Sequence, residues 1–464
     1  MLMLHNTLTG KKEEFHPLEE GVARVYTCGP TVYDYAHIGN FRTFVFQDLL
    51  IRYLRYRSYK VIHVMNITDV DDKTIRCARE SGMSLKDYTT KYTEAFLEDA
   101  GALHIELPAL LPRATEHIPE MVELIRRLEE KGHTYRKDGS IYYSIATFPG
   151  YGKLSKKDFS GMQAAGRVDS DEYEKKDDAR DFVLWKARKE GEDYWETELG
   201  PGRPGWHIEC SAMSMKYLGP TFDIHCGGVD LIFPHHENEI AQSEAATGNT
   251  FVRYWAHSEF LLVEGEKMAK SKGNYFTLRD LLAAGHAPEA IRYLLLSVNH
   301  RRQLNFTTDG LHQAEASVRR LEDFLVHMRE KSSPGPASSD FASAVEGTRQ
   351  KFIEAMDDDL NTSAALAAIF DFVRAAYQRD EQGALTGGDA RSAMELLHDF
   401  DRVLGVLRAQ PQLLDAEIMK RIEERQAARR RRDFAEADRI RDGLHSQGIQ
   451  LEDTKDGVRW KRIR

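Results

Sequence analysis

The N-terminal part of the chain alternates between hydrophobic and polar positions in the way that a βαβ unit does. Residues 22–28 alternate with the period of a strand. Residues 60–67 form a more continuous apolar run, which predicts a second and more buried strand. Between the two strands, large apolar side chains recur at helical spacing: Phe41, Phe44, Val45, Leu49 and Tyr53. Strand, helix and strand in succession indicate a nucleotide-binding parallel sheet.

The pattern changes after residue 110. Short strands and turns follow, with the clearest strand at 139–144 and an acidic stretch at 169–181. A strand at 260–263 and a helical region come later. We interpret these changes as four successive parts: a first half of the sheet domain (1–110), an insertion (111–200), a second half of the sheet domain (201–255), and a strand, loop and helices (256–331).

Helix-breaking residues at 332–339 form the clearest linker in the chain. Beyond it, apolar positions at helical spacing predict a helical bundle over 341–410. A small module over 416–464 begins with a helix and ends in strand-like pieces near 449–451 and 458–460. The predicted fold class is therefore α/β: a Rossmann-like parallel-sheet domain with an insertion, then an α-helical bundle and a small mixed α/β C-terminal module.

The composition fits a globular protein of several domains. The chain has 464 residues, of which 41% are hydrophobic and 30% charged, and this leaves enough apolar material for sizeable cores. No apolar run approaches the roughly 18 residues that span a bilayer, and the first residues lack the pattern of a signal peptide. We therefore expect a cytoplasmic protein that does not enter the membrane.

Cysteine usage and charge narrow the possible partners. Four dispersed cysteines are too few for a disulfide framework, and as thiols they remain able to bind metal. The net charge of -10 argues against nonspecific binding of nucleic acid by the surface as a whole. The chain is nevertheless basic near its end, where Arg429–Arg432 form one run. A local basic surface can still contact phosphates.

Two short motifs far apart carry the strongest functional signal. Residues 37–40 read His-Ile-Gly-Asn, and residues 267–271 read Lys-Met-Ala-Lys-Ser. In this order, each after strand-like sequence, they resemble the two ATP-binding signatures of class I aminoacyl-tRNA synthetases. Three further runs make the chain similar to the cysteinyl-tRNA synthetase family over essentially its whole length: Tyr-Thr-Cys-Gly-Pro-Thr-Val-Tyr-Asp at 26–34, Gly-Trp-His-Ile-Glu-Cys-Ser at 205–211 and Phe-Pro-His-His-Glu-Asn-Glu at 233–239.

Adenylation of an amino acid depends on positioning and on stabilising phosphate charge. We expect His37 and Asn40 at the start of a helix, where both can donate to phosphate oxygens, while Gly39 lets the nucleotide approach the backbone. Lys267 and Lys270, on a glycine-flanked loop, suit a mobile clamp on the leaving pyrophosphate.

The resemblance assigns catalytic roles to His37, Asn40, Lys267 and Lys270. It also implies that Gly29 belongs to the ATP site and that ATP binds with magnesium (Mg²⁺). Position 269 departs from the family pattern, because an alanine replaces the usual serine. Taken alone, each motif has an ordinary interpretation: a plain strand–helix turn for the first and a lysine-rich surface loop for the second.

Two thiols, an imidazole and a carboxylate suggest a zinc (Zn²⁺) site at Cys28, Cys210, His235 and Glu239. On a helix, His235 and Glu239 would share one face. From the residues alone, buried free cysteines are an equally good interpretation. The resemblance assigns all four side chains to one zinc ion, which would favour the thiolate of a cysteine substrate over the hydroxyl of serine. We accordingly expect no editing domain.

The resemblance also implies an amino-acid pocket in which Trp206 forms a wall. We interpret His207 and His236 as hydrogen-bonded structural residues rather than metal ligands, and Cys226 as a bystander thiol. The residues implied for the pocket are Cys28, Thr68, Asp69, Trp206 and His225.

The helical bundle and the C-terminal module resemble the parts of the family that bind tRNA, the module being the anticodon-binding part. Unpaired bases are read by stacking and by hydrogen bonds to their edges. The candidates for these contacts are Arg429, Phe434, Asp438, Asp453 and Trp460. A solvated helix face balanced by nearby acidic residues is an equally good interpretation of Arg429–Arg432. The expected partners are tRNA(Cys), ATP and L-cysteine, and we expect a monomer.

Three alternatives remain open at this point. A ligase that passes activated cysteine to a small amine would lack the C-terminal module, which is present here. A catalytically silent relative would not need the two ATP motifs and the presumed zinc set. A persulfide-forming side activity with pyridoxal phosphate is reported for some members of the family, which use lysines after the pair Asp71-Asp72 and in the clamp loop. Here Lys73 is present, but Arg76 occupies the place of a second lysine, and arginine cannot form a Schiff base.

Overall fold

The chain folds into two compact units, Met1–Leu407 and Arg408–Arg464, in a computed structural model. The structure describes residues 1–157, 180–268, 273–407, 412–431, 433–446, 449–454 and 457–462. Among the described residues, no helix is both long and apolar enough to cross a membrane.

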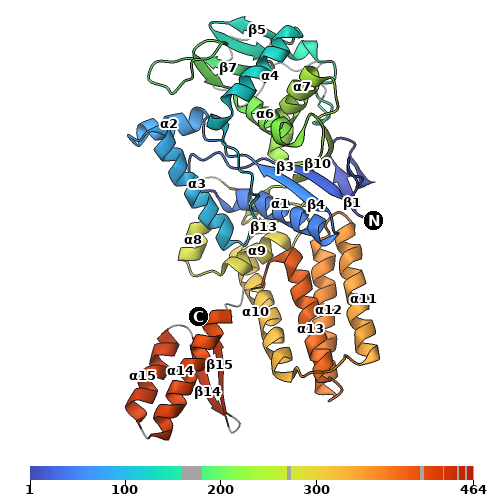
Figure 1. Ribbon diagram of the computed structural model, residues 1–464, viewed down its shortest axis with the longest axis vertical. Coiled ribbons are helices and arrows are strands. Elements are labelled where there is room, and N and C mark those ends of the chain that lie inside the picture. The colour runs from blue at the N-terminus through green and yellow to red at the C-terminus, as the bar shows by residue number, and fades with distance from the viewer. Residues whose placement is uncertain are drawn as a thin grey trace. The chain divides into compact units, whose positions relative to one another are not determined.

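A four-stranded parallel sheet forms the centre of the first unit (Figure 1). Its strand order is β10-β9-β3-β4, and every neighbouring pair runs parallel. The predicted βαβ unit is confirmed, because helix α1 connects β3 to β4. The elements are β3 (Val22–Thr27), α1 (Ile38–Tyr56), β4 (Lys60–Met65), β9 (Phe222–Gly228) and β10 (Val252–Ser258).

Both faces of this sheet are covered by helices, as the hydrophobic strands require. Figure 1 shows α1 on one side and α6 (Trp206–Leu218) on the other, and α7 (Glu237–Thr247) precedes β10. Side chains alternate between two cores: Val25 packs into the core shared with α1, and Tyr26 into the core shared with α6. The loops after β3, β4 and β9 therefore meet at the carboxyl edge of the sheet, where ligands bind in such folds.

The insertion is a separate antiparallel sheet with strand order β5-β6-β7-β8. Because Gly202–Pro204 form its last strand, this sheet continues past residue 200, the end expected from the sequence. Most of the acidic stretch at 169–181 lies outside the described residues. The elements are η1 (Ala114–Glu116), α4 (Ile118–Glu130), β5 (Thr134–Lys137), β6 (Ser140–Tyr143), η2 (Ile145–Thr147), β7 (Phe182–Ala187) and β8 (Gly202–Pro204).

Helices α2 (Asp72–Glu80) and α3 (Leu85–Ala102) follow β4. Asp72 joins α2 to the insertion: Lys186 Nζ lies 2.6 Å from its Oδ2, and Arg203 binds its other oxygen. Burial alone would raise the pKa of Asp72, but these two cations hold it well below its usual range.

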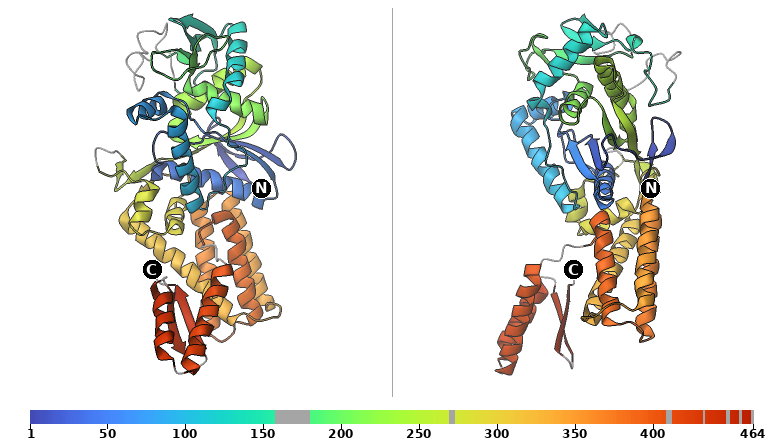
Figure 2. Two further views of the ribbon diagram at one scale, coloured as in Figure 1. Left: turned by 60° about the vertical axis from the view of Figure 1, so that its left-hand side comes forward. Right: turned by 45° about the vertical axis from the view of Figure 1, so that its right-hand side comes forward.

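The rest of the first unit contains a two-stranded sheet, a small three-stranded sheet, short helices and a helical bundle. Figure 2 shows the bundle and the insertion at opposite ends of this unit. Buried Arg292 on α9 joins the parts, since it pairs with Asp48 on α1 and donates to the Leu404 carbonyl at the end of α13. The elements are β1 (Met3–Asn6), β2 (Lys11–Glu14), β11 (Leu261–Val263), β12 (Glu266–Lys267), α8 (Leu278–Ala283), α9 (Pro288–Leu296), β13 (Leu304–Phe306), α10 (Thr308–Lys331), α11 (Ser339–Asp357), α12 (Thr362–Glu381) and α13 (Gly387–Leu404).

The second unit is a pair of helices with an antiparallel hairpin. Its first helix begins at Gln412, four residues before the start expected from the sequence, and the hairpin occupies the two predicted strand-like pieces. Ile418, Ile422, Leu444 and Ile449 form its small core. The elements are α14 (Gln412–Arg430), α15 (Phe434–Ser446), β14 (Ile449–Thr454) and β15 (Gly457–Arg462).

Candidate active site

The described start of the lysine motif, Lys267 and Met268, lies beside the first motif in the folded chain. The backbone N–H of Ile38 donates to the Phe276 carbonyl at 3.0 Å, and His37 forms an isolated β-bridge with Thr277. A Cβ atom on Gly39 would lie 3.1 Å from the terminal methyl of Met268. The start of α1 and the first residues of the lysine motif, more than two hundred residues apart in sequence, are therefore neighbours.

The first motif is a helix cap with a defined tautomer. Nδ1 of His37 accepts from the Asn40 backbone at 3.1 Å, and Oδ1 of Asn40 accepts from the His37 backbone at 3.1 Å. Because Nδ1 is an acceptor, the imidazole proton is on Nε2, which makes that nitrogen a donor. The cap therefore orients both side chains at a helix N-terminus, where backbone N–H groups and the helix dipole favour anions.

Lys267 ends strand β12 and is exposed. Its ammonium nitrogen lies 5.4 Å from the centre of the Phe260 ring. A cation–π contact of this kind is weak when the pair is exposed. Lys270 and Ala269 lie outside the described residues. Lys267 and Met268 thus place the beginning of the lysine motif next to the first motif.

A buried set of potential metal ligands lies at the same edge of the sheet. Cys28 directly follows β3, Cys210 is on α6, His235 is in the short turn η4 (Ile232–His236), and Glu239 is on α7. One donor atom from each lies within 4.8 Å of all the others. The two sulfur atoms are 3.9 Å apart, and His235 Nε2 lies 3.0 Å from Glu239 Oε1.

The chemistry of this set fits a divalent cation. Oε1 of Glu239 is buried and, among the described residues, receives no hydrogen bond of acceptable geometry. Burial opposes the charged form of each group. The neighbouring His225 and His235 nevertheless lower the pKa of Glu239 to about 2. Glu239 and Cys210 in turn raise the pKa of His235 to about 10. Burial raises the pKa of Cys28, whereas contact with Cys28 and His235 lowers the pKa of Cys210 to about 6 against the effect of burial. A cation could replace the proton of His235 and stabilise both thiolates.

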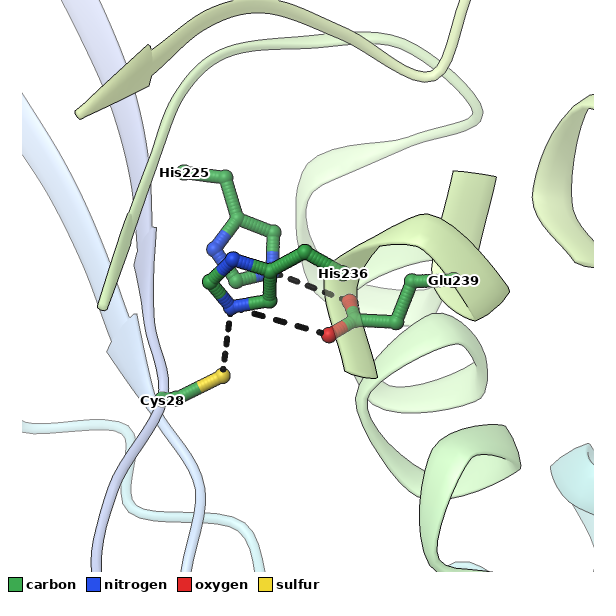
Figure 3. A group of neighbouring side chains, drawn as sticks. All are labelled: Cys28, His225, His236 and Glu239. Atoms are coloured by element: carbon green, nitrogen blue, oxygen red, sulfur yellow. Dashed lines mark hydrogen bonds and ion pairs between the residues drawn. The ribbon is translucent and has the colours of Figure 1, made fainter. Parts of the chain in front are cut away.

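Other histidines hold these side chains in place. Figure 3 shows His225 and His236 beside Cys28 and Glu239. His225 Nε2 lies 2.9 Å from Glu239 Oε2, and His236 Nε2 lies 3.3 Å from Cys28 Sγ. These four side chains form a second possible ligand set that shares Cys28 and Glu239 with the first. His207 also contacts the first set, because its Nδ1 lies 3.0 Å from Nδ1 of His235.

His225 and His236 have the contacts of supporting residues. His236 Nδ1 is 2.8 Å from His257 Nε2, and the His225 ring stacks on Trp255 at 4.7 Å. Burial and the neighbouring histidines keep the pKa of His236 well below its usual value, so its ring is neutral. Hydrogen-bonded neighbours of this kind orient metal ligands.

Trp206 and Thr68, two residues predicted for the amino-acid pocket, lie close to the ligand set: Trp206 contacts His235, and Thr68 contacts the residue before Cys210. Trp206 remains 37% exposed while its ring stacks on His235 at 4.3 Å, so the indole is not enclosed. Thr68 Oγ1 donates to Glu209 Oε2 at 2.9 Å and accepts from Asn66 Nδ2 at 3.1 Å. Asp69 differs from Thr68 in its partner, because both of its carboxylate oxygens accept hydrogen bonds from Thr115.

Glu209 is a candidate site residue that the sequence reasoning missed. It is fully buried, and Oε1 has no hydrogen-bond partner among the described residues. Burial, together with the charge of Cys210, raises its pKa well above the usual value. Its position directly before Cys210 was the one feature of the sequence that could have indicated this residue. Only the fold shows that this helical glutamate is buried.

Gly29 is required by packing. A Cβ atom there would lie 1.7 Å from the Asn66 carbonyl oxygen. The Gly29 backbone N–H donates to Oδ1 of the same asparagine at 3.0 Å. The glycine therefore allows the segment after β3, which carries Cys28, to approach the segment after β4, which carries Thr68.

The chain matches a family model for the tRNA synthetases class I (C) catalytic domain over residues 14–316, and a DALR domain over 351–408. The cysteine–tRNA ligase of Solibacter usitatus is 55% identical, and that of Koribacter versatilis 51% identical, with 99% of both chains covered in each case. The chain belongs to the cysteine–tRNA ligase family.

Solved structures of other class I synthetases share the fold of this family member. Mycobacterium tuberculosis methionyl-tRNA synthetase, in complex with methionyl-adenylate, is 17% identical with a TM-score of 0.60, covering 82% of this chain and 89% of its own. A leucyl enzyme from Agrobacterium radiobacter, in a ternary complex with tRNA, is 12% identical with a TM-score of 0.59, covering 84% and 85%. The predicted fold class is confirmed.

In this family member, the candidate tRNA contacts lie in the second unit. Phe434 begins α15 with 60% of its surface exposed, whereas Trp460 is partly buried against the small core. Arg429 is in the last turn of α14, and Asp438 pairs with Arg441 at 3.1 Å. Asp453 is opposite Val458 in the hairpin, and its side chain lies outside the described residues. Phe434 is therefore more exposed than Trp460, the other aromatic candidate.

Proposed function

We propose that the chain activates L-cysteine with ATP to cysteinyl-adenylate and transfers it to the 3′ end of tRNA(Cys). The observation that carries this proposal is the buried Cys28, Cys210, His235 and Glu239 set next to the pocket wall at Trp206. Membership of the family supports the reaction. The assignment of individual residues rests on their contacts.

In the first step, the carboxylate of cysteine attacks the α-phosphate of ATP, and pyrophosphate leaves. The Nε2–H of His37 and the amide nitrogen of Asn40 supply donors at the N-terminus of α1, where phosphate oxygens are stabilised. Lys267, with Lys270, would stabilise charge on the leaving pyrophosphate, whose Mg²⁺ arrives with ATP. No covalent enzyme intermediate is needed, because positioning and charge stabilisation provide the catalysis.

Selection of cysteine follows from the chemistry of the pocket. A zinc ion held by Cys28, Cys210, His235 and Glu239 would supply a Lewis-acidic site with a preference for thiolate over hydroxyl. Trp206 would exclude water beside it, and His225 and His236 would keep Glu239 and Cys28 in place. A hydrophobic pocket alone separates similar side chains by only a few kcal/mol, about 1–3.

The α-ammonium group of the substrate would bind at Thr68. A hydroxyl has one proton and two acceptor positions. The Thr68 proton is used by Glu209, and one acceptor position by Asn66, so a second acceptor position remains for a cationic donor. Glu209 is then a positioning residue, because it fixes the direction of the Thr68 hydroxyl.

In the second step, transfer to tRNA, the tRNA would be bound by the second unit. Its exposed Phe434 and basic Arg429 suit stacking and phosphate contacts with an unpaired anticodon.

The experiment is amino-acid-dependent ATP–pyrophosphate exchange with cysteine and serine in parallel, on full-length protein with measured zinc content. We expect exchange with cysteine only, and its loss after zinc removal or in Cys210→Ala. Cys226→Ala is the matched control, since Cys226 is equally buried on β9 but belongs to neither ligand set. Zinc-replete, folded protein that shows no exchange would instead identify a silent relative.

A further inference from the structure

We infer that His286, His312 and Glu315 form a second site for a divalent transition metal, separate from the proposed zinc site. One donor atom from each of these three side chains lies within 4.8 Å of the other two. His286 is in the turn between α8 and α9, and the other two residues are on α10. None of the three belongs to the proposed adenylation site.

The distance between His286 and Glu315 suits bonds to one metal ion. His286 Nδ1 lies 2.9 Å from Glu315 Oε1. With bonds of about 2.1 Å to each atom, a metal between them would make an angle of roughly 90°. His312 and Glu315 are three residues apart on a helix and therefore project from the same face. The two imidazole rings have centroids 5.9 Å apart and are tilted by 48°, so they do not stack in a way that would block a shared ion.

Hydrogen bonds and core packing hold the backbone that carries these donors. The His286 N–H donates to the Leu281 carbonyl at 3.1 Å, which closes the end of α8. Thr307 caps α10 by accepting from Gly310 at 2.9 Å. Leu311 precedes His312 and is buried in the core that α10 shares with α9. Little backbone ordering would be needed on binding, which favours affinity.

The ligand types indicate which metals would bind. Two imidazoles and one carboxylate suit zinc, cobalt, nickel or iron rather than magnesium or calcium, which prefer oxygen. Three protein ligands leave positions for water. His312 is exposed and the other two are half-buried, so an ion could enter from solvent. A bound ion would fasten the turn after α8 to α10, in the segment that follows the lysine motif.

The test uses full-length protein dialysed against buffered zinc, with bound metal counted per chain. We expect two equivalents in the unaltered chain and one in His312→Ala. His327→Ala is the matched control, because His327 is on the same helix, pairs with Asp380 and belongs to no metal-ligand group among the described residues. It should keep both equivalents. A single equivalent in the unaltered chain would overturn the inference.

Cobalt distinguishes the two sites by their ligands. Cobalt bound to thiolates gives sulfur-to-metal charge-transfer absorption in the near ultraviolet, whereas a site with nitrogen and oxygen ligands does not. The equivalent lost in His312→Ala should therefore contribute no charge-transfer band. If that equivalent carried such a band, or if both equivalents persisted in His312→Ala, the second ion would lie elsewhere and the inference would be wrong. Circular dichroism of each variant checks that folding is unchanged.

Discussion

Replacing Thr68 by valine tests the proposed amino-acid pocket with almost no change in side-chain volume. The hydroxyl that donates to Glu209 and accepts from Asn66 becomes a methyl group. Both partners are buried, and Oε1 of Glu209 already lacks a partner among the described residues. The variant therefore loses the proposed contact with the substrate ammonium and leaves a buried carboxyl group with no donor.

The expected rise in the KM for cysteine follows from the type of hydrogen bond that is lost. A hydrogen bond to a charged group contributes about 1.5–3 kcal/mol. The loss of one such bond corresponds to a rise in the KM for cysteine of roughly 10- to 150-fold. Leaving Glu209 without its donor should also lower the free energy of unfolding by about 1–3 kcal/mol. The KM for ATP should not change, because Thr68 contacts no residue of the two ATP motifs in the proposed mechanism.

The assay is cysteine-dependent ATP–pyrophosphate exchange at saturating ATP, on protein with measured zinc content. Thr68→Ser is the matched control, since it keeps the hydroxyl and removes only a methyl group. A buried methyl contributes about 0.8 kcal/mol, so the KM of the serine variant should rise no more than about fourfold. If the valine variant, with zinc bound, showed the same KM for cysteine as the serine variant, the hydroxyl would have no role in binding and the reasoning would be refuted.

Three further predictions concern packing, charge and RNA. Gly29→Ala should destabilise the fold by about 3 kcal/mol or more in urea unfolding, because its Cβ would overlap the Asn66 carbonyl; an unchanged midpoint would contradict this contact. The pKa of Asp72 is lowered in the folded state, so its stabilisation is present above about pH 4 and disappears as the pH falls; the stability difference between the wild type and Asp72→Asn should shrink in acid, and a constant difference would contradict this. Phe434→Ala should raise the KM for tRNA by roughly 5- to 150-fold, a loss of about 1–3 kcal/mol, without changing pyrophosphate exchange; an unchanged KM would exclude stacking on this ring.

The parts of the fold that local sequence patterns predicted are those with strong periodicity. Strand β3, helix α1 and strand β4 follow from apolar spacing, and the hairpin at the C-terminus follows from two short strand-like pieces. Boundaries were less certain: the insertion sheet includes Gly202–Pro204, and α14 begins at Gln412. Both differences arise because strand pairing and helix packing extend elements beyond the point where the local pattern fades.

The sequence by itself determined which chemical groups the protein has and, through its resemblance to a family, which of them to consider together. It did not determine their surroundings. Cys28 and Cys210 are 182 positions apart, and their sulfur atoms lie 3.9 Å apart only because β3 and α6 meet at the edge of the sheet. Glu209 and Asp69 are both acidic and buried, yet both oxygens of Asp69 accept from Thr115, whereas one oxygen of Glu209 accepts from Thr68 and the other has no partner among the described residues. Contacts between distant segments and the loss of water around a side chain are properties of tertiary packing, so only the folded structure could decide them.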